Sequence, residues 1–366
     1  MMVRAFRCSS ACRTGISKRI AVWILLCGLV GAGFPARASA EGEILSRYPL
    51  PAAPFDIAVE SSSRVWFTLP EANAIGSLEL TGREPVYTQY VYTQYPLPTA
   101  DSEPYRLVVA AGQVWFTQRQ GNRIGRLTIA DGSLVEYPVP TAASQPTGID
   151  VAPDGRVWFA ESAGNRLAVL TPATGTIVER PTGRTNTQLD RVNAQSAGIV
   201  WVTAPGINLL FGYRLANADF ISVSLEDTTG AQGSLRGLAV SNIGVPWVST
   251  RNIAKLGSYL YGTLSIWIWY RYSPTTADLV DLVWTDVTGK PVFWGLDAAR
   301  KELVQIDAET LGVRHRMPVG GNDSQLTELA FDPTGGVAWV ADSGTSSLYS
   351  WQALYSLKSY LPVIAR

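Results

Sequence analysis

Cysteine and histidine are scarce in this chain of 366 residues. The three cysteines (Cys8, Cys12 and Cys27) all lie near the N-terminus, and His315 is the only histidine. Residues 1–40 read as a leader that is removed, so the mature chain should have no thiol. That excludes disulfide bonds, thiolate metal sites and a cysteine nucleophile. It also leaves one imidazole for any chemistry that needs a histidine.

The leader combines three features of a secretory signal peptide. Residues 1–40 hold six basic residues and no acidic one, an apolar run over 20–34, and Ala38-Ser39-Ala40 at the end. We expect cleavage after Ala40 and a secreted, extracellular, periplasmic or cell-surface protein. An uncleaved membrane anchor is the alternative, and lipidation at Cys27 is disfavoured because bulky Leu26 precedes it.

Charge is also in short supply, at 16% of the residues. Removing the six basic residues of the leader leaves 24 basic against 30 acidic residues, a net charge of about −6. A mildly acidic chain is a poor partner for nucleic acid or anionic lipid. After the leader, no run reaches the 18 apolar residues of a membrane span, so we expect no membrane insertion after cleavage.

What the chain has in abundance is a repeat. Tyr-Pro-Leu-Pro at 95–98 is followed by Pro104 and by Val-Trp-Phe-Thr at 114–117, and related versions occur over 48–68 and 137–160. The short runs between turn signals are rich in Val, Ile, Thr, Tyr and Trp, which is typical of strands. No stretch keeps a helical period. The sequence therefore predicts an all-β repeat protein.

The spacing of the tryptophans indicates the number of repeats. One Trp recurs in the second strand expected of each unit: Trp66, Trp115, Trp158, Trp201, Trp247, Trp294 and Trp339. The period fits the four-stranded blade of a propeller, and a flat aromatic side chain fills the wedge between twisted sheets. We predict a seven-bladed β-propeller of four-stranded antiparallel blades over residues 41–360, with a tail at 361–366.

The same pattern locates individual strands. Residues 44–48 read as an outer strand that precedes the first inner strand, so they should pair with the last blade and close the ring, with 354–360 as the alternative. The doubled Tyr-Thr-Gln-Tyr at 87–95 should lengthen one outer strand, and 259–272 reads as the outer strand of unit five. Inner strands are expected near 55–60, 105–110, 147–152, 190–196, 235–240, 279–284 and 326–331.

The Tyr-Pro-Leu-Pro, Pro-x-x-Ile and Val-Trp-Phe-Thr motifs, with Asn-Arg-Ile-Gly-Arg-Leu at 122–127, resemble the virginiamycin B lyase (streptogramin B lyase) family. The resemblance is close over 44–180 and thin over 185–366. It implies a seven-bladed propeller that opens a cyclic depsipeptide antibiotic by elimination, with histidines, glutamates and a magnesium ion at the channel mouth. The family's characteristic histidine follows a proline at the start of an inner strand. The matching positions here hold other residues: Phe55, Tyr105, Thr147, Arg236 and Thr327.

The remaining histidine does not replace them. His315 stands between Arg314 and Arg316 on an expected outer strand of unit six, which places it on the rim. An elimination needs a base near the acidic Cα–H and an acid or metal for the leaving group. Carboxylates would have to perform both roles, so the sequence supports the family's fold more than its activity.

A binding face is expected where loops from all seven blades meet around the channel. We predict ligand contacts from Phe55, Tyr105, Arg119, Arg236 and Arg251, a set suited to a polar ligand with apolar rings or to a peptide. The same face should present further residues: Glu71, Asp101, Glu103, Arg106, Glu161, Arg191, Asp297, Asp323, Glu328 and Asp342.

Three of these carboxyl groups share one position in the repeat. Glu161, Asp297 and Asp342 follow the tryptophan strand of their units and could together hold Mg²⁺ or Ca²⁺ through oxygen ligands. The alternative is that each is solvated or caps its own loop. We expect no other cofactor.

Two classes of function remain open. The first is an exported, monomeric propeller that binds a small polar or peptide ligand on its loop face, without the family's histidine-dependent chemistry. The second is a divergent metal-dependent lyase that opens a cyclic depsipeptide or a lactone.

Overall fold

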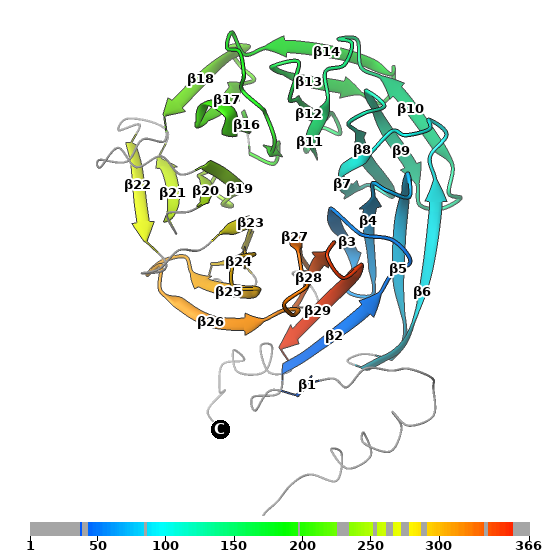
Figure 1. Cartoon of the computed structure of the whole chain (residues 1–366). Helices are drawn as coiled ribbons and strands as arrows, with labels where there is room; N and C mark the ends of the chain where they lie inside the picture. Colours follow the sequence, from blue (N-terminus) through cyan, green and yellow to red (C-terminus); the bar gives the residue numbers. More distant parts are fainter. Residues whose placement is uncertain are drawn as a thin grey trace, which may run out of the picture. The chain divides into compact units, whose positions relative to one another are not determined.

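The computed structural model describes residues 37–38, 43–83, 86–196, 198–224, 234–251, 255–260, 266–271, 278–286, 291–332 and 336–353. Most of the expected leader, and residues 354–366, lie outside that set. In the unit that begins at Ala38, the strands form seven antiparallel sheets arranged in a ring (Figure 1). The predicted all-β, seven-bladed propeller is confirmed.

Each blade runs from an inner strand near the axis to an outer strand at the circumference. Blade 1 contains β3 (Ile57–Ser61), β4 (Arg64–Leu69), β5 (Ala74–Arg83) and β6 (Val86–Pro96). Blade 2 contains β7 (Pro104–Ala110), β8 (Gln113–Gln118), β9 (Arg123–Thr128) and β10 (Leu134–Pro138). Blade 3 contains β11 (Pro146–Val151), β12 (Val157–Glu161), β13 (Arg166–Thr171) and β14 (Thr176–Pro181).

The second half repeats this order. Blade 4 contains β15 (Val192–Asn193), β16 (Ile199–Ala204), β17 (Leu209–Arg214) and β18 (Asp219–Ser224), with a 3-10 turn, η1 (Pro205–Ile207), after β16. Blade 5 contains β19 (Ser234–Val240), β20 (Pro246–Arg251), β21 (Lys255–Leu260) and β22 (Ile266–Arg271). Blade 6 contains β23 (Leu279–Thr285), β24 (Val292–Asp297), β25 (Glu302–Asp307) and β26 (Val313–Pro318).

Blade 7 closes the ring with strands from both ends of the chain. It contains β27 (Leu326–Asp332), β28 (Val337–Asp342) and β29 (Ser347–Ala353), and its outer strand is β2 (Glu43–Pro49), which follows the two-residue β1 (Arg37–Ala38). β2 pairs with β29 from Glu43↔Ala353 to Pro49↔Ser347. The predicted closure by the N-terminal strand is confirmed, and it leaves no open seam between first and last blades.

The seven repeating tryptophans all lie on second strands and fill the interfaces between blades. Trp66 packs against Leu107 and Phe116 of the next blade. On the other side of blade 1, Trp339 packs against Phe67, and so joins the last blade to the first. The other five occupy the equivalent positions between their own blades: Trp115, Trp158, Trp201, Trp247 and Trp294. All seven are at most 9% exposed, which is the packing role predicted from their spacing.

Two strand predictions need correction. Residues 259–272 do not form one outer strand, because Tyr259 lies in the third strand β21 and pairs with Trp267 of the outer strand β22. Aromatic residues occur in both of these paired strands, which is why the sequence pattern favours a single strand. In blade 4 the inner strand covers Val192–Asn193 rather than 190–196, and the two residues before it bond across the channel: Asp190 to Arg106, and Arg191 to Glu328 and the Val280 carbonyl.

Helix is almost absent from the described part of the chain. Its helical element is the single turn η1, and none of its helices is long and apolar enough to cross a membrane.

Candidate ligand site at the channel mouth

A common three-residue frame lies at or just before the start of each of the seven inner strands, and it places the site. A proline or leucine comes first and packs inward: Pro54, Pro104, Pro146, Leu189, Leu235, Leu279 and Leu326. The next residue forms what we call the mouth ring: Phe55, Tyr105, Thr147, Asp190, Arg236, Val280 and Thr327. The third forms the neck ring: Asp56, Arg106, Gly148, Arg191, Gly237, Asp281 and Glu328.

Backbone irregularity turns these residues toward the axis. In blades 2, 3, 5, 6 and 7 the pairing of the first two strands shifts register at this frame. A β-bulge leaves residues unpaired and re-aims their side chains. The frame therefore delivers charged groups to the channel without interrupting the rest of the blade.

The threonine of the Val-Trp-Phe-Thr motif holds the frame in place. Thr68 Oγ1 accepts a hydrogen bond from the Asp56 N–H at 3.0 Å and donates to the Tyr105 carbonyl of the next blade at 3.0 Å. Thr117 makes the equivalent bonds to the Arg106 N–H at 3.1 Å and the Thr147 carbonyl at 2.8 Å. Each hydroxyl satisfies a bulged backbone donor and links two blades.

Arg106 is the centre of the neck ring. Its Nε and Nη2 donate to the two carboxylate oxygens of Asp190 at 3.1 and 3.2 Å, and its Nη1 donates to Glu328 Oε2 at 2.7 Å. Asp56 Oδ1 lies 3.6 Å from the same Nη1. One buried guanidinium thus joins blades 1, 2, 4 and 7 with charge-assisted bonds.

Arg191 extends the network to blade 6. Its Nη1 bonds to Glu328 and lies 3.3 Å from Asp281 Oδ1, and its Nη2 donates to Glu328 Oε2 at 3.0 Å and to the Val280 carbonyl at 3.1 Å. Two carboxylates also accept from backbone: Asp56 from the Leu107 N–H at 2.7 Å and Asp281 from the Leu329 N–H at 3.1 Å.

The neck contains more carboxyl groups than guanidiniums, and the pKa values reflect it. Burial and the nearby Glu328 raise the pKa of Asp56 to about 7, and burial raises the pKa of Asp281 well above its usual value. Burial alone would also raise the pKa of Glu328 and Asp190, but Arg191 and Arg106 hold both below their usual range. Glu328 and Asp190 are thus held ionised beside the two arginines, Asp281 favours the protonated form, and Asp56 gains or loses its proton near neutral pH.

Steric contacts explain why two positions of the neck ring are occupied by glycine. A Cβ on Gly148 would lie 1.8 Å from the Asp190 carbonyl oxygen, and one on Gly237 would lie 2.8 Å from the Leu282 backbone nitrogen. Any side chain there would push the adjacent inner strands apart.

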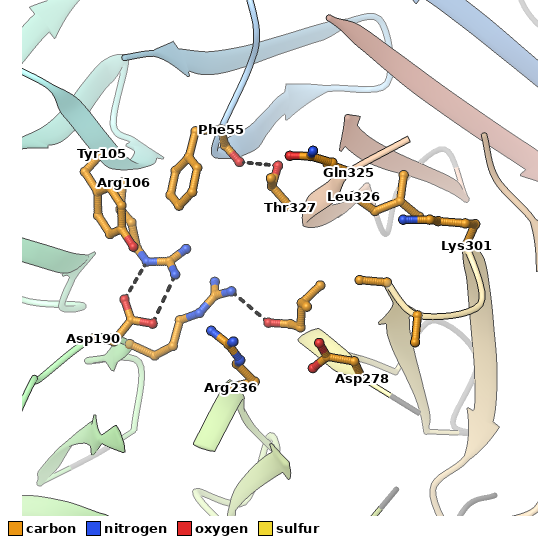
Figure 2. A pocket seen from close by; sticks show the side chains of 14 residues that line it. Phe55, Tyr105, Arg106, Asp190, Arg236, Asp278, Lys301, Gln325, Leu326 and Thr327 are labelled. Atoms are coloured by element: carbon orange, nitrogen blue, oxygen red, sulfur yellow. Dashed lines mark hydrogen bonds and ion pairs between the residues drawn. The ribbon is translucent and has the colours of Figure 1, made fainter. Parts of the chain in front are cut away.

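Above the neck lies a cavity of about 580 Å³. Six of the seven mouth-ring residues line it, all except Thr147, together with Arg106, Arg191, Asp278 and residues of the β24–β25 and β26–β27 loops (Figure 2). Its volume is in the range of small-molecule sites. Figure 2 shows Arg106 bound to Asp190 on one side and Phe55 bonded through its carbonyl to Thr327 on another.

An aromatic pair forms one wall. The rings of Phe55 and Tyr105 stack with centroids 4.5 Å apart. Arg119 lies 4.5 Å above the Tyr105 ring and donates from Nε to Glu103 at 2.9 Å, so it supports the wall from behind and does not line the cavity. The wall is therefore held in place before any ligand enters.

Arg236 differs from the other arginines of the site. Its guanidinium points into the cavity near Asp278 (Figure 2), and within the described residues it makes no hydrogen bond or ion pair. Its Nε is buried without a partner. Lys301, across the cavity, donates to the Ser324 carbonyl. Arg236 is thus the cation best placed to receive an acceptor group from outside.

The three carboxyl groups predicted to hold a metal lie in separate blades. Asp342 accepts from the backbone of Gln325, Gly344 and Thr345, and Asp297 from the backbone of Asp278 and Arg300. These are the bonds of loop caps. No group of three His, Cys, Asp or Glu side chains in the described ranges is arranged to hold a metal ion. The metal site stays a prediction that this geometry does not support.

Glu161 lies in a different environment from Asp297 and Asp342. The equivalent residue of blade 2 shows what this position requires. In blade 2 the equivalent residue is Gln118, whose amide donates to Glu136 Oε1 at 2.8 Å. In blade 3 a fully buried Glu161 occupies this position beside Glu179. Burial and then the charge of Glu179 raise the pKa of Glu161 to about 8. A protonated Glu161 carries a donor, as the glutamine does.

The structure places three of the five predicted ligand contacts in the lining of the cavity. Phe55, Tyr105 and Arg236 line the cavity, and Arg119 supports it. Arg251 ends β20, and its side chain lies outside what the structure describes. Sequence reasoning missed Asp190, Asp278 and Lys301, although aligning the three-residue frame would have placed Asp190 beside Phe55 and Tyr105. His315 lies exposed on the outer strand β26, as expected.

Known proteins match this chain in sequence and in fold. The model of the virginiamycin B lyase family matches residues 25–248, more than half of the chain. Virginiamycin B lyase of Nocardia farcinica is 33% identical over 110 residues, and this match spans only 36% of that relative and 30% of this chain.

Solved structures extend the fold comparison. Virginiamycin B lyase from Staphylococcus aureus superposes with a TM-score of 0.72 at 22% identity, covering 85% of this chain and 99% of that one. A catalytically inactive His-to-Ala variant of the same protein with quinupristin gives the same TM-score at 21% identity, with the same coverage. These likenesses establish a shared fold. With the family model matching blades 1 to 4 and part of blade 5, the chain belongs to the virginiamycin B lyase family.

Proposed function

We propose that this chain is an exported propeller that binds a small polar or peptide ligand in the mouth cavity, without histidine-dependent elimination. The observation that carries the proposal is the cavity itself, where Arg236 makes no hydrogen bond or ion pair with the described residues, although its charge helps to lower the pKa of Asp190, and where an aromatic wall is already formed. A buried donor without a partner is costly unless a ligand or water supplies an acceptor.

The lining indicates the chemistry of the ligand. Phe55 and Tyr105 offer apolar surface for a ring or a flat peptide group, and Arg236 offers a planar donor for a carboxylate or carbonyl oxygen. Arg106 and Arg191 are already bound to carboxylates, so they set the floor of the cavity. A ligand with an aromatic group and an acceptor group fits this division.

The same lining gives little support for elimination. No histidine lines the cavity, and the sole histidine of the sequence is on the rim strand β26. Asp190, a carboxylate that lines the cavity, is held ionised by Arg106, and a low pKa makes it a weak base.

Two probes test the proposal. N-acetyl-L-phenylalanine presents a ring and a carboxylate, and quinupristin is the compound found with the inactive Staphylococcus aureus variant. Ligand-observed NMR should show binding of at least one probe to wild type. Arg236→Gln and Tyr105→Ala should weaken binding at least about tenfold, equal to 1.4 kcal/mol.

Arg156→Gln provides the matched control. It removes one positive charge from the β11–β12 turn at the opposite end of the blade, where Arg156 pairs with Asp154. Binding should be unchanged in this variant. If neither probe binds, or if the control weakens binding as much as Arg236→Gln does, the proposal is wrong.

Family membership favours one alternative, a divergent lyase. Incubation with quinupristin and Mg²⁺, followed by liquid chromatography and mass spectrometry, distinguishes the outcomes. Elimination gives a new peak of unchanged mass, whereas hydrolysis adds the mass of one water. Either product, if lost in Arg236→Gln, would replace binding with catalysis as the function.

A further inference from the structure

The outer strand of blade 1 breaks a pattern that the other six outer strands follow. β6 has 11 residues, whereas the other outer strands have 5 to 7. Every other outer strand contains at least one charged residue, such as Glu136 in β10 or Arg314 in β26. β6 reads Val-Tyr-Thr-Gln-Tyr-Val-Tyr-Thr-Gln-Tyr-Pro and contains none.

Charge and short length protect a strand edge from pairing with another chain. β6 pairs with β5 on one side, and no described strand pairs with its other side. Val91 is 51% exposed and Tyr90 is 40% exposed, and they belong to the few large apolar side chains exposed in the described part of the molecule. This edge lacks the protection that the chain gives to its other edges.

The edge is held in shape by the closing strand. The Tyr90 ring packs edge-on against Tyr48 of β2, 5.4 Å between centroids, and its hydroxyl donates to the Pro49 carbonyl at 3.3 Å. Tyr92 stacks on Phe67 at 6.2 Å on the blade's core side. The strand is therefore ordered before it meets any partner, which lowers the entropy lost on association.

The doubled Tyr-Thr-Gln-Tyr makes β6 complementary to itself. When two copies run antiparallel with Val91 opposite Val91, Tyr90 lies opposite Tyr92 and Gln89 lies opposite Thr93. Aromatic pairs and polar pairs both stabilise antiparallel sheets, and no like charges meet. The edges of the other blades would bring charged residues together in some registers, and they are shorter.

We propose that β6 is a homodimerisation edge, at which two copies of this chain form a continuous sheet across a two-fold axis at Val91. The occupant is a second copy because the complementarity is that of the strand with itself. This proposal departs from the monomer expected from the sequence, and it does not depend on the cavity or its ligand.

Multi-angle light scattering coupled to gel filtration tests the proposal on the mature chain. Wild type should approach twice the monomer mass as its concentration rises from about 1 to 200 µM, the range expected of a small interface. Val91→Lys places two lysines opposite each other and should raise the dissociation constant at least about tenfold.

Two controls separate the edge from general effects on folding. Val135→Lys changes an equally apolar, 37% exposed valine on the outer strand β10 and should leave the dimer intact. An equimolar mixture of Val91→Lys and Val91→Glu should recover the dimer mass, since opposite charges then meet. A wild-type monomer throughout the range, polydisperse aggregates, or a dimer unaffected by Val91→Lys would each overturn the proposal.

Discussion

The mouth ring and the neck ring are one residue apart in every blade, yet they treat charge differently. In the neck, Arg106 and Arg191 are buried and bound by carboxylates from several blades. In the mouth, Arg236 makes no hydrogen bond or ion pair with the described residues, and Phe55 and Tyr105 stack without burying a charge between them.

The difference indicates how one repeated frame serves two purposes. Residues in the third position join blades 1, 2, 4, 6 and 7 through a network of charges, and blades 3 and 5 have glycine there. Of the two charged residues in the second position, Asp190 is bound by Arg106 and Arg236 remains available to a ligand. Removing an arginine from the neck should therefore lower the free energy of unfolding, whereas removing Arg236 from the mouth should weaken ligand binding.

The largest difference in stability is expected between Arg106→Ala in the neck and Arg236→Ala in the mouth. Arg106→Ala removes the arginine that binds both oxygens of Asp190 and leaves Glu328 with Arg191 alone, and we expect a loss of roughly 5 kcal/mol in the free energy of unfolding, near the upper end for a broken buried pair. Arg236→Ala should change it by less than about 0.5 kcal/mol. Urea unfolding followed by tryptophan fluorescence measures both.

Equal losses in the two variants would contradict the division of roles. Since Arg106→Ala could fail to fold, Arg106→Lys provides a milder version: it keeps the charge but cannot bond to Asp190 through two nitrogens, and its loss should be intermediate.

The seven-bladed architecture could be predicted from the sequence because packing between blades requires a tryptophan at a nearly regular interval. Each tryptophan fills the same wedge, so Trp66 and Trp339 mark equivalent places at opposite ends of the chain. Closure by residues 44–48 followed from counting strands. The outer strand of blade 5 was misplaced because aromatic residues occur in both β21 and β22, and the tryptophan period does not distinguish the third strand of a blade from its outer strand.

The site was harder to predict because its contacts join distant blades. The sequence placed Arg106, Arg191 and Glu328 on the channel face. It could not show that Arg106 meets Asp190 and Glu328 while Arg236 meets no such partner. These pairings depend on side-chain reach across the ring, which no local pattern encodes. The metal site at Glu161, Asp297 and Asp342 stays a prediction, and the sequence could not show that Asp297 and Asp342 accept bonds from the backbone of their own loops.

Glu161 provides a second test of how the fold treats excess carboxyl charge, at a position away from the channel. The equivalent Gln118 of blade 2 shows the same position without the charge. If excess carboxyl charge is neutralised by a proton in the neck, the same should hold for Glu161 beside Glu179. A carboxyl whose pKa is raised on folding stabilises the folded state fully below its unfolded pKa of 4.5, and that contribution is lost as pH rises through about 8.

We therefore expect wild type to lose stability between pH 5 and pH 9, with roughly 3–5 kcal/mol of the loss due to Glu161. Glu161→Gln reproduces the Gln118–Glu136 bond of blade 2 and should remove this part of the loss while changing stability little at pH 5. Gln118→Glu is the reciprocal variant and should introduce a similar dependence. Parallel pH profiles for wild type and Glu161→Gln would refute the assignment.

Asp56→Asn tests the same principle inside the neck, where the effect should be smaller because Arg106 offsets part of the burial. Its pKa of about 7 means that Asp56 favours folding below its unfolded value of 3.8 and loses that contribution as pH rises through 7. Asparagine keeps a carbonyl oxygen for the Leu107 N–H and carries no charge at any pH. Between pH 5 and pH 9 the variant should lose roughly 2–3 kcal/mol less than wild type. A larger loss than wild type would mean that Asp56 acts as an ionised partner of Arg106, and the neck would then hold three carboxylates against two arginines.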